Sequence, residues 1–280
     1  MTIAGRPFHA RRGARLLLAV LVIAILGVGG WVLYVRATGN PGCEVPRTAS
    51  ACTRIFFIGN SYTSVNDLPA MFSNLAWSGG HRVETAARAP GGWTLLDHSH
   101  SSDTTGVIAS SNWDIVVLQE QSEIPAVESL RQSFLYPGAR DLVPAIRDDG
   151  ARPMFYMTWA HRNGSPVNGL PDYAAMQSAL DEGYLFIAHE QNAALAPVGP
   201  AWASIVSQGG ETGLWQDDAS HPTAKGTYLA ASVFYAAVFL ESPVGLKFQA
   251  GLSAADAEQM QKAAADTVLA DQARWGLPGT

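Results

Sequence analysis

The sequence predicts an α/β domain in which helices cover both faces of a mostly parallel, five-stranded sheet. From residue 54 onward, short apolar runs alternate with longer helical patterns, as parallel β–α units require. The run Asp-Ile-Val-Val-Leu at 114–118 fits a central strand that is buried on both faces. The expected strands span 54–58, 82–87, 114–118, 153–158 and 193–198, and the expected helices span 67–78, 126–148, 173–191, 223–240 and 254–275, with a short helix after residue 92.

The segments before residue 54 are expected to lie outside this domain. Residues 16–35 carry no charge over 20 positions, which is long enough to cross a bilayer as an N-terminal transmembrane helix. Four arginines in residues 1–15 favour a cytoplasmic basic tail, so the rest of the chain would lie on the extracytoplasmic side. The alternative is a cleaved signal peptide and a secreted protein. Residues 36–53 read as a linker and 54–280 as the folded domain.

Composition excludes one class of partner. The first 36 residues hold five arginines and no acid, although the whole chain has 18 basic and 24 acidic residues. The body is therefore acidic and has no basic cluster, which argues against nucleic-acid binding. With 48% apolar residues, the chain suits one domain with a sizeable core, which we expect to be a monomer.

The chain has two cysteines, and both lie in the linker region. In an oxidising compartment Cys43 and Cys52 would form a disulfide that closes a small loop and ties the linker to the domain. The alternative is a pair of free thiols.

A serine and a histidine stand in positions typical of nucleophilic catalysis. Ser61 follows the apolar strand 54–58 through Gly-Asn, and a strand that ends in a sharp turn can expose a serine hydroxyl. Serine needs a base and the base needs a carboxylate, and Asp218-Ala-Ser-His221 supplies both. Asp217 is the competing carboxylate. The structural alternative is that Ser61 and His221 belong to ordinary turns that cap the helices after them.

Topology would bring these residues together. In a parallel sheet, sites form beyond the carboxyl ends of the strands. Ser61, the pair Gly91-Gly92 and the segment 119–122 each follow an expected strand, and His221 precedes the helix expected at 223–240. We therefore expect all four segments to lie at one edge of the sheet.

These segments resemble the conserved blocks of the SGNH (GDSL-like) hydrolase superfamily over roughly residues 54–240. Gly59-Asn60-Ser61 resembles the nucleophile block, Pro90-Gly91-Gly92-Trp93-Thr94 the glycine block, and Asp218 with His221 the final block. The third block departs from the usual Gly-x-Asn-Asp, because Gln119-Glu120-Gln121-Ser122 stands there. The resemblance implies a flavodoxin-like three-layer sandwich, a Ser61-His221-Asp218 triad, no metal and no cofactor.

The resemblance also implies an oxyanion hole. Its donors would be the backbone N–H groups of Ser61 and Gly92, with Gly91 as the alternative glycine, and the side-chain amide of Gln121 in place of the family's asparagine. The alternative for Gln121 is a loop amide that satisfies backbone groups. Trp93, Glu120 and Trp215 are expected to border the substrate.

The expected function is that of a serine esterase or deacylase acting on short acyl esters, with a small molecule or a polysaccharide carrying the ester. Two alternatives share the fold. One is an acyltransferase acting on envelope polysaccharide, which would use the same acyl-enzyme. The other is a glycan-binding domain without catalysis.

Overall fold

The computed structural model describes residues 40, 42–43, 51–110, 112–210 and 213–278. The chain divides into two units, 1–41 and 42–280, and the described strands and helices belong to the second. The membrane-spanning helix expected at 16–35 lies outside the described residues. Within the described ranges no helix combines the length and the apolar character needed to cross a bilayer.

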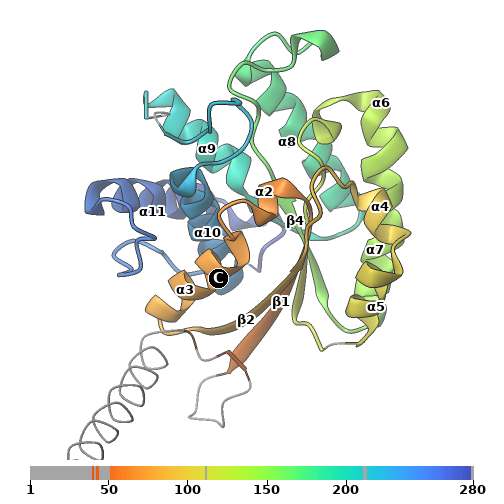
Figure 1. The fold of residues 1–280 in the computed structure, drawn as a ribbon, viewed down its shortest axis with the longest axis horizontal. Helices are drawn as coiled ribbons and strands as arrows, with labels where there is room; N and C mark the ends of the chain where they lie inside the picture. The colour runs from red at the N-terminus through yellow and green to blue at the C-terminus, as the bar shows by residue number, and fades with distance from the viewer. Residues whose placement is uncertain (1–39, 41, 44–50, 111, 211–212, 279–280) are drawn as a thin grey trace, which may run out of the picture. The chain divides into compact units, whose positions relative to one another are not determined.

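Five parallel strands form the sheet, as the sequence predicted. They are β1 (Cys52–Ile58), β2 (Arg82–Arg88), β3 (Ile115–Leu118), β4 (Arg152–Met157) and β5 (Ala194–Pro197). Their order is β2-β1-β3-β4-β5, and β1, β2 and β4 are labelled in Figure 1. The chain leaves β1 toward one edge and later returns to β3 on its other side. A topological switch point therefore lies between β1 and β3, where such sheets bind their ligands.

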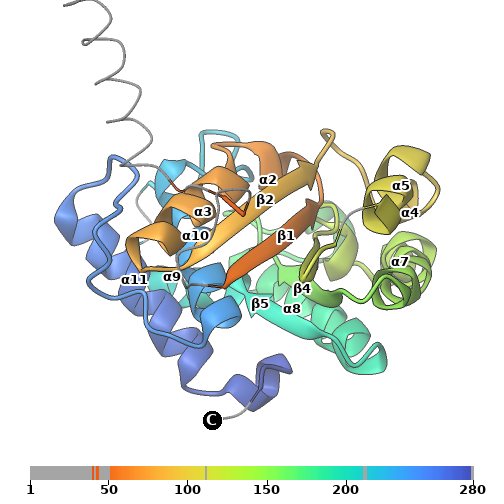
Figure 2. The same cartoon turned by 90° about the horizontal axis from the view of Figure 1, so that it is seen from below.

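Helices cover the sheet on both faces (Figure 2). One layer consists of α3 (Leu68–Ser78), α9 (Val198–Ser207), α10 (Ala224–Phe239) and α11 (Ala254–Leu269). The other consists of α4 (Leu95–Ser99), α5 (Ser102–Ser110), α7 (Tyr136–Asp148) and α8 (Tyr173–Glu190). The three-layer α/β architecture predicted from the sequence is confirmed for the described residues.

Several helical features differ from the sequence prediction. Helices α5 and α9 were not expected, and the helix expected at 126–148 is divided. It begins with the short turns Ile124–Ala126 and α6 (Glu128–Leu130), continues as a π-helical turn at Arg131–Leu135 and becomes α-helical only at Tyr136. The C-terminal helix likewise ends at Leu269, before a 3₁₀ turn at Gln272–Trp275.

The core forms on both sides of β1. Phe57 meets Phe72 of α3 and Phe234 of α10 edge to face, at centroid distances of 6.3 and 5.3 Å. Phe56, which points to the opposite face, stacks on Trp113 at 5.3 Å. Consecutive strand residues alternate between faces, so this one strand anchors both helical layers. It thereby fixes the position of the turn that follows it.

The amino end of β1 carries a disulfide. Cys43 and Cys52 are bonded, with their Cα atoms 5.5 Å apart. The Cys43 backbone N–H also donates to Glu84 on β2, at 3.3 Å. The chain before β1 is therefore attached covalently to the sheet, at the end of the strand opposite to Ser61.

Candidate active site

Ser61 is the first residue of α2 (Ser61–Ser64), directly after the turn that ends β1. Asn60 caps this short helix, and its side-chain Oδ1 accepts the N–H of Tyr62 at 3.2 Å. No acceptor within the described chain meets the Ser61 backbone N–H. A free N–H at a helix start, next to the serine hydroxyl, is suited to binding a developing oxyanion.

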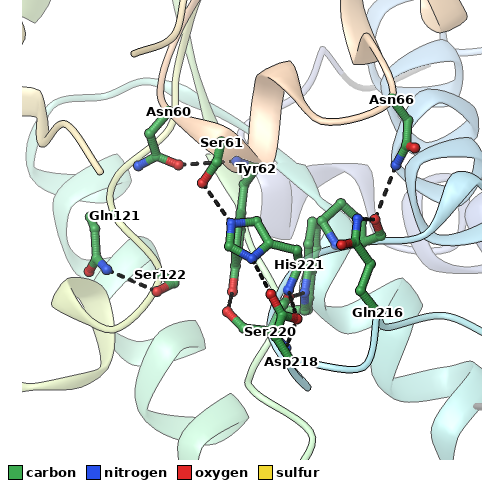
Figure 3. Close-up of polar contacts among 12 residues, drawn as sticks. Asn60, Ser61, Tyr62, Asn66, Gln121, Ser122, Gln216, Asp218, Ser220 and His221 are labelled. Atoms are coloured by element: carbon green, nitrogen blue, oxygen red, sulfur yellow. Dashed lines mark hydrogen bonds and ion pairs between the residues drawn. The ribbon is translucent and has the colours of Figure 1, made fainter. Parts of the chain in front are cut away.

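His221 and Asp218 complete a hydrogen-bonded triad with Ser61 (Figure 3). The His221 Nε2 lies 2.8 Å from Ser61 Oγ, and its Nδ1 lies 2.5 Å from Asp218 Oδ2. Asp218 Oδ1 also accepts the backbone N–H groups of Ser220 and His221, at 3.0 and 2.9 Å. Asp217, the alternative carboxylate, is exposed and makes no such contact. The structure thus brings together the three residues that the sequence singled out.

The environment favours the charges that a triad needs. Burial opposes ionisation of Asp218, but hydrogen bonds from the N–H of Ser220 and from the ring and N–H of His221 outweigh it and lower the pKa of the carboxyl. Asp218 is therefore an anion at neutral pH. Because the Asp218 anion accepts a hydrogen bond from His221 Nδ1, the proton stays on that nitrogen. Nε2 is then free to accept the proton of Ser61.

Aromatic residues hold the loop that carries His221. The ring of Tyr62 stacks on Trp159 at 4.6 Å, and Trp159 stacks on Trp202 at 4.2 Å. The Tyr62 hydroxyl lies 2.6 Å from Ser220 Oγ, and Trp159 Nε1 donates to the Ser220 carbonyl at 3.0 Å. Tyr62 immediately follows Ser61, so this aromatic stack connects the serine turn to the histidine loop.

Gln119 fixes the serine turn from the neighbouring strand. Its Oε1 accepts the Asn60 N–H and the Thr63 hydroxyl, both at 2.9 Å, and its Nε2 donates to Asn60 Oδ1 at 2.9 Å. The side chain is fully buried. Sequence reasoning missed this role. A signal existed, because the β1–β3 register pairs Ile58 with Leu118 and so sets Gly59 opposite Gln119.

A buried histidine supports the same turn. His98 Nε2 lies 2.8 Å from the Gly59 carbonyl, and its Nδ1 lies 2.9 Å from Thr104 Oγ1. A carbonyl only accepts, so Nε2 carries the proton and Nδ1 accepts the threonine hydroxyl. Burial lowers the pKa of His98 and keeps the ring neutral. His98 is thus part of the scaffold of the site, and no cluster of three or more metal-ligating side chains occurs among the described residues.

The expected oxyanion donors lie in neighbouring segments, with one difference. Gln121 Nε2 donates to Ser122 Oγ at 3.0 Å, and in Figure 3 the carboxamide is directed toward Ser122 rather than toward Ser61. The glycine segment lies beside Asn60, whose Nδ2 donates to the Trp93 carbonyl at 2.9 Å. Gly92 is exposed with φ +76°, a conformation that glycine adopts without strain.

Two residues expected to border the substrate are buried instead. Glu120 is 0% exposed, and its carboxyl oxygens accept backbone N–H groups. Trp215 is 4% exposed, because it packs against Trp202 and its Nε1 donates to the Ala160 carbonyl at 3.1 Å. Both side chains therefore support the site from the interior of the domain. Trp93 is partly exposed, so its side chain remains a candidate for substrate contact.

A third histidine lies near the triad. His161 follows β4, and its Nδ1 is 3.7 Å from Glu123 Oε1. Burial lowers the pKa of His161, while Glu123 and Asp218 act in the opposite direction. Its Nε2 is buried and has no hydrogen-bond partner within the described residues.

A hollow in the described part of the domain lies elsewhere. A cavity of about 490 Å³ opens at the amino ends of β3, β4 and β5, lined in part by Ile115, Arg152 and Ala194. It is at the opposite edge of the sheet from Ser61. Because it contains no nucleophile–base pair, we assign the active site by its chemistry and not by the size of the hollow.

Comparison with solved structures shows which family this fold belongs to. A protein assigned to the SGNH hydrolases from Slackia heliotrinireducens shares 30% sequence identity, with a TM-score of 0.56, over 66% of this chain and 98% of that one. This chain belongs to the SGNH hydrolase superfamily. As an SGNH hydrolase it is a serine ester hydrolase.

More distant structures share the fold of this SGNH hydrolase. A DUF4886 family protein from Bacteroides uniformis is 17% identical, with a TM-score of 0.67, over 78% of this chain and 95% of that one. An α/β hydrolase from the metagenome of Lake Arreo is 15% identical, with a TM-score of 0.51, over 67% and 95%. No known protein-family profile and no curated protein matches the sequence.

Proposed function

We propose that this SGNH hydrolase is an esterase or deacylase that removes short acyl groups through Ser61, His221 and Asp218. The observation that carries the proposal is the continuous hydrogen-bonded line from Ser61 Oγ to His221 Nε2, at 2.8 Å, and from His221 Nδ1 to Asp218, at 2.5 Å. These distances allow proton transfer without rearrangement of either side chain.

In the proposed reaction Ser61 Oγ attacks the ester carbonyl while His221 takes its proton. The imidazolium, stabilised by Asp218, then gives that proton to the leaving alcohol, and an acyl-enzyme remains. A water molecule, deprotonated by His221, attacks the acyl carbonyl, and the proton returns to Ser61 as the acid leaves. At the end of each cycle Ser61 is protonated again and His221 is neutral, as at the start.

The oxyanion formed in both steps needs donors, and three lie in adjoining segments. They are the Ser61 N–H, the Gly92 N–H and the Gln121 carboxamide, which has to turn from Ser122 toward Ser61. The Ser122 hydroxyl that Gln121 would release lies close to Tyr62, whose hydroxyl it can hydrogen-bond. The rotation therefore leaves Ser122 with a partner.

A short acyl group on a polar alcohol, such as a sugar, is the proposed substrate class. Long acyl chains require exposed apolar surface. Among the described residues the exposed large hydrophobic side chains are Val167, Phe186 and Val244, and none belongs to the triad segments. The polar side chains of Glu123 and His161 instead lie near Tyr62 and the triad, and such groups suit a hydroxylated partner.

Labelling with a fluorophosphonate tests the proposal directly. Wild-type protein should be labelled covalently and Ser61→Ala should not. Ser64→Ala is the matched control, because Ser64 is exposed on the same short helix and its loss should leave labelling unchanged. Labelling of Ser61→Ala at the wild-type rate would remove Ser61 as the nucleophile. A series of p-nitrophenyl esters, together with acetylated xylan, then defines the acyl length and the alcohol.

We also propose that the domain works on the extracytoplasmic side, tethered by residues 16–35. The Cys43–Cys52 disulfide supports this, because disulfides persist in oxidising compartments. The measurement is protease digestion of intact cells or spheroplasts, in which the domain should be cleaved without lysis. Protection until lysis would contradict the proposed location.

A further inference from the structure

Glu120 is a buried carboxyl group that the proposed mechanism does not use. It follows β3 directly and is 0% exposed. Its Oε1 accepts the Gln121 N–H at 2.6 Å, and its two oxygens share the Leu95 N–H at 3.3 and 3.2 Å. Buried carboxylates are normally paired with a cation. Glu120 forms no ion pair with any described residue.

These contacts join two segments that are far apart in sequence. Leu95 begins α4, immediately after the glycine turn that ends in Gly92, Trp93 and Thr94. Gln121 lies beyond the end of β3. Both segments contribute proposed oxyanion donors, and Glu120 is hydrogen-bonded to each of them. Its side chain therefore fixes the separation of the Gly92 turn from the Gln121 turn.

The surroundings favour the uncharged form of this carboxyl. Burial raises the pKa of Glu120 to about 8, although the N–H groups of Gln121 and Leu95 act against it. The other titratable groups that face it are Asp97 on α4, which adds to the rise, and the hydroxyl of Tyr184 on α8, which accepts the Glu120 N–H at 3.3 Å. The free-energy cost of burying the charge is therefore larger than the stabilisation that the hydrogen bonds give to the charged form.

We propose that Glu120, in its uncharged form, is a positioning residue that holds the glycine turn and the Gln121 turn at the spacing the oxyanion hole requires. The inference rests on the proposed function, because it concerns the same oxyanion. The inference concerns neither the nucleophile nor the base, so it can be wrong while the proposed roles of Ser61 and His221 are correct.

Ionisation of Glu120 should therefore lower activity. A buried anion without a cation is relieved by movement toward water, and this movement pulls on Leu95 and Gln121. The same negative charge also opposes the negative charge that develops on the substrate oxygen. Both effects act in one direction, so the acylation rate should fall as the pH rises through about 8.

Two substitutions separate the hydrogen bonds from the charge. Glu120→Gln keeps a carbonyl acceptor and cannot ionise, whereas Glu120→Met keeps the volume but removes the acceptor. Glu258→Gln is the control, since it removes an exposed carboxylate on α11, remote from the site. The readouts are the rate of fluorophosphonate labelling and the kcat and KM for a short p-nitrophenyl ester, each from about pH 6 to about pH 10.

The wild-type activity is expected to fall above about pH 8. Glu120→Gln should match the wild-type rate at pH 7 and lose the fall. Glu120→Met should lose about 10- to 100-fold in kcat with little change in KM. If the wild-type and Glu120→Gln profiles coincide above pH 8, or if Glu120→Met keeps its kcat, the inference is wrong. The comparison of the wild-type and Glu120→Gln profiles decides even if Glu120→Met does not fold. A failure of the proposed function would give a different result, namely that the Ser61→Ala variant is still labelled.

Discussion

Gly59 is the position where the smallest change should have the largest effect on the site. A Cβ placed there would lie 2.4 Å from Gln119 Oε1, 2.6 Å from Thr63 Oγ1 and 3.1 Å from Gln119 Cβ. Both neighbours are fully buried and cannot move into solvent. The φ angle of Gly59 is not positive, so the demand for glycine here is one of space and not of backbone conformation.

The expected cost of Gly59→Ala follows from the hydrogen bonds that Gln119 must give up. Its Oε1 accepts the Asn60 N–H and the Thr63 hydroxyl, each at 2.9 Å. Two lost hydrogen bonds are worth about 1 kcal/mol each, and a buried N–H left unpaired adds about 1–3 kcal/mol. We therefore expect the free energy of unfolding to fall by about 3–5 kcal/mol. The displaced turn should slow labelling of Ser61 at least about tenfold.

Urea unfolding and fluorophosphonate labelling measure the two effects. Gly106→Ala is a control of opposite sign. That glycine lies within α5 with open space around its Cβ position, so alanine should stabilise the helix by about 0.5–1 kcal/mol. The reasoning is refuted if Gly59→Ala unfolds at the wild-type urea concentration and labels at the wild-type rate.

Three further predictions concern stability and positioning. The folded pKa of Glu120, about 8, exceeds its ordinary value of 4.5, so its contribution to stability is lost as the pH rises from about 4.5 to about 8. Glu120→Gln removes that loss, and urea unfolding at pH 9 should show it more stable than the wild type by at most about 5 kcal/mol, with no such gain at pH 4. Replacing both Cys43 and Cys52 by serine opens a loop whose ends are 9 residues apart, and guanidinium unfolding should show a loss of at most about 3 kcal/mol that reductant reproduces in the wild type. Tyr62→Phe removes the hydroxyl contact to Ser220 but keeps the stack on Trp159, so kcat should fall about tenfold while the melting temperature changes little; an unchanged kcat would show that this contact does not position His221.

The sheet was predictable because its strands are formed by apolar runs in the sequence. The run at 55–58 is buried throughout, and the observed strand begins two residues before the expected one. Helix α5 was missed because its sequence Ser-Asp-Thr-Thr-Gly-Val-Ile-Ala-Ser is mostly polar and buries only Thr104 and Ile108. Helix α9 was missed because its first turn contains Gly199 and Pro200, residues that are typical of turns. Gly199 is required there by space, since a Cβ would lie 2.2 Å from the Thr158 carbonyl oxygen.

The site was predictable as a set of segments but not as a set of contacts. Spacing alone left both Asp217 and Asp218 within reach of His221. The loop decides between them, because Ala219 adopts φ +61° and thereby turns the N–H groups of Ser220 and His221 toward Asp218. Neighbouring positions in the Gln-Glu-Gln-Ser segment also differ in burial. The family motif indicated Gln121 as the functional amide, but the buried hydrogen bonds to the serine turn are made by Gln119.

The aromatic stack that joins the serine turn to the histidine loop has an optical consequence. Trp159 and Trp202 lie parallel with 4.2 Å between their centroids, and Trp215 meets Trp202 edge to face at 5.1 Å. Indole chromophores at such separations couple their electronic transitions, and all three belong to segments that pack behind His221. The near-ultraviolet circular dichroism of this protein should therefore report on the assembly of its active site, with no substrate and no added label.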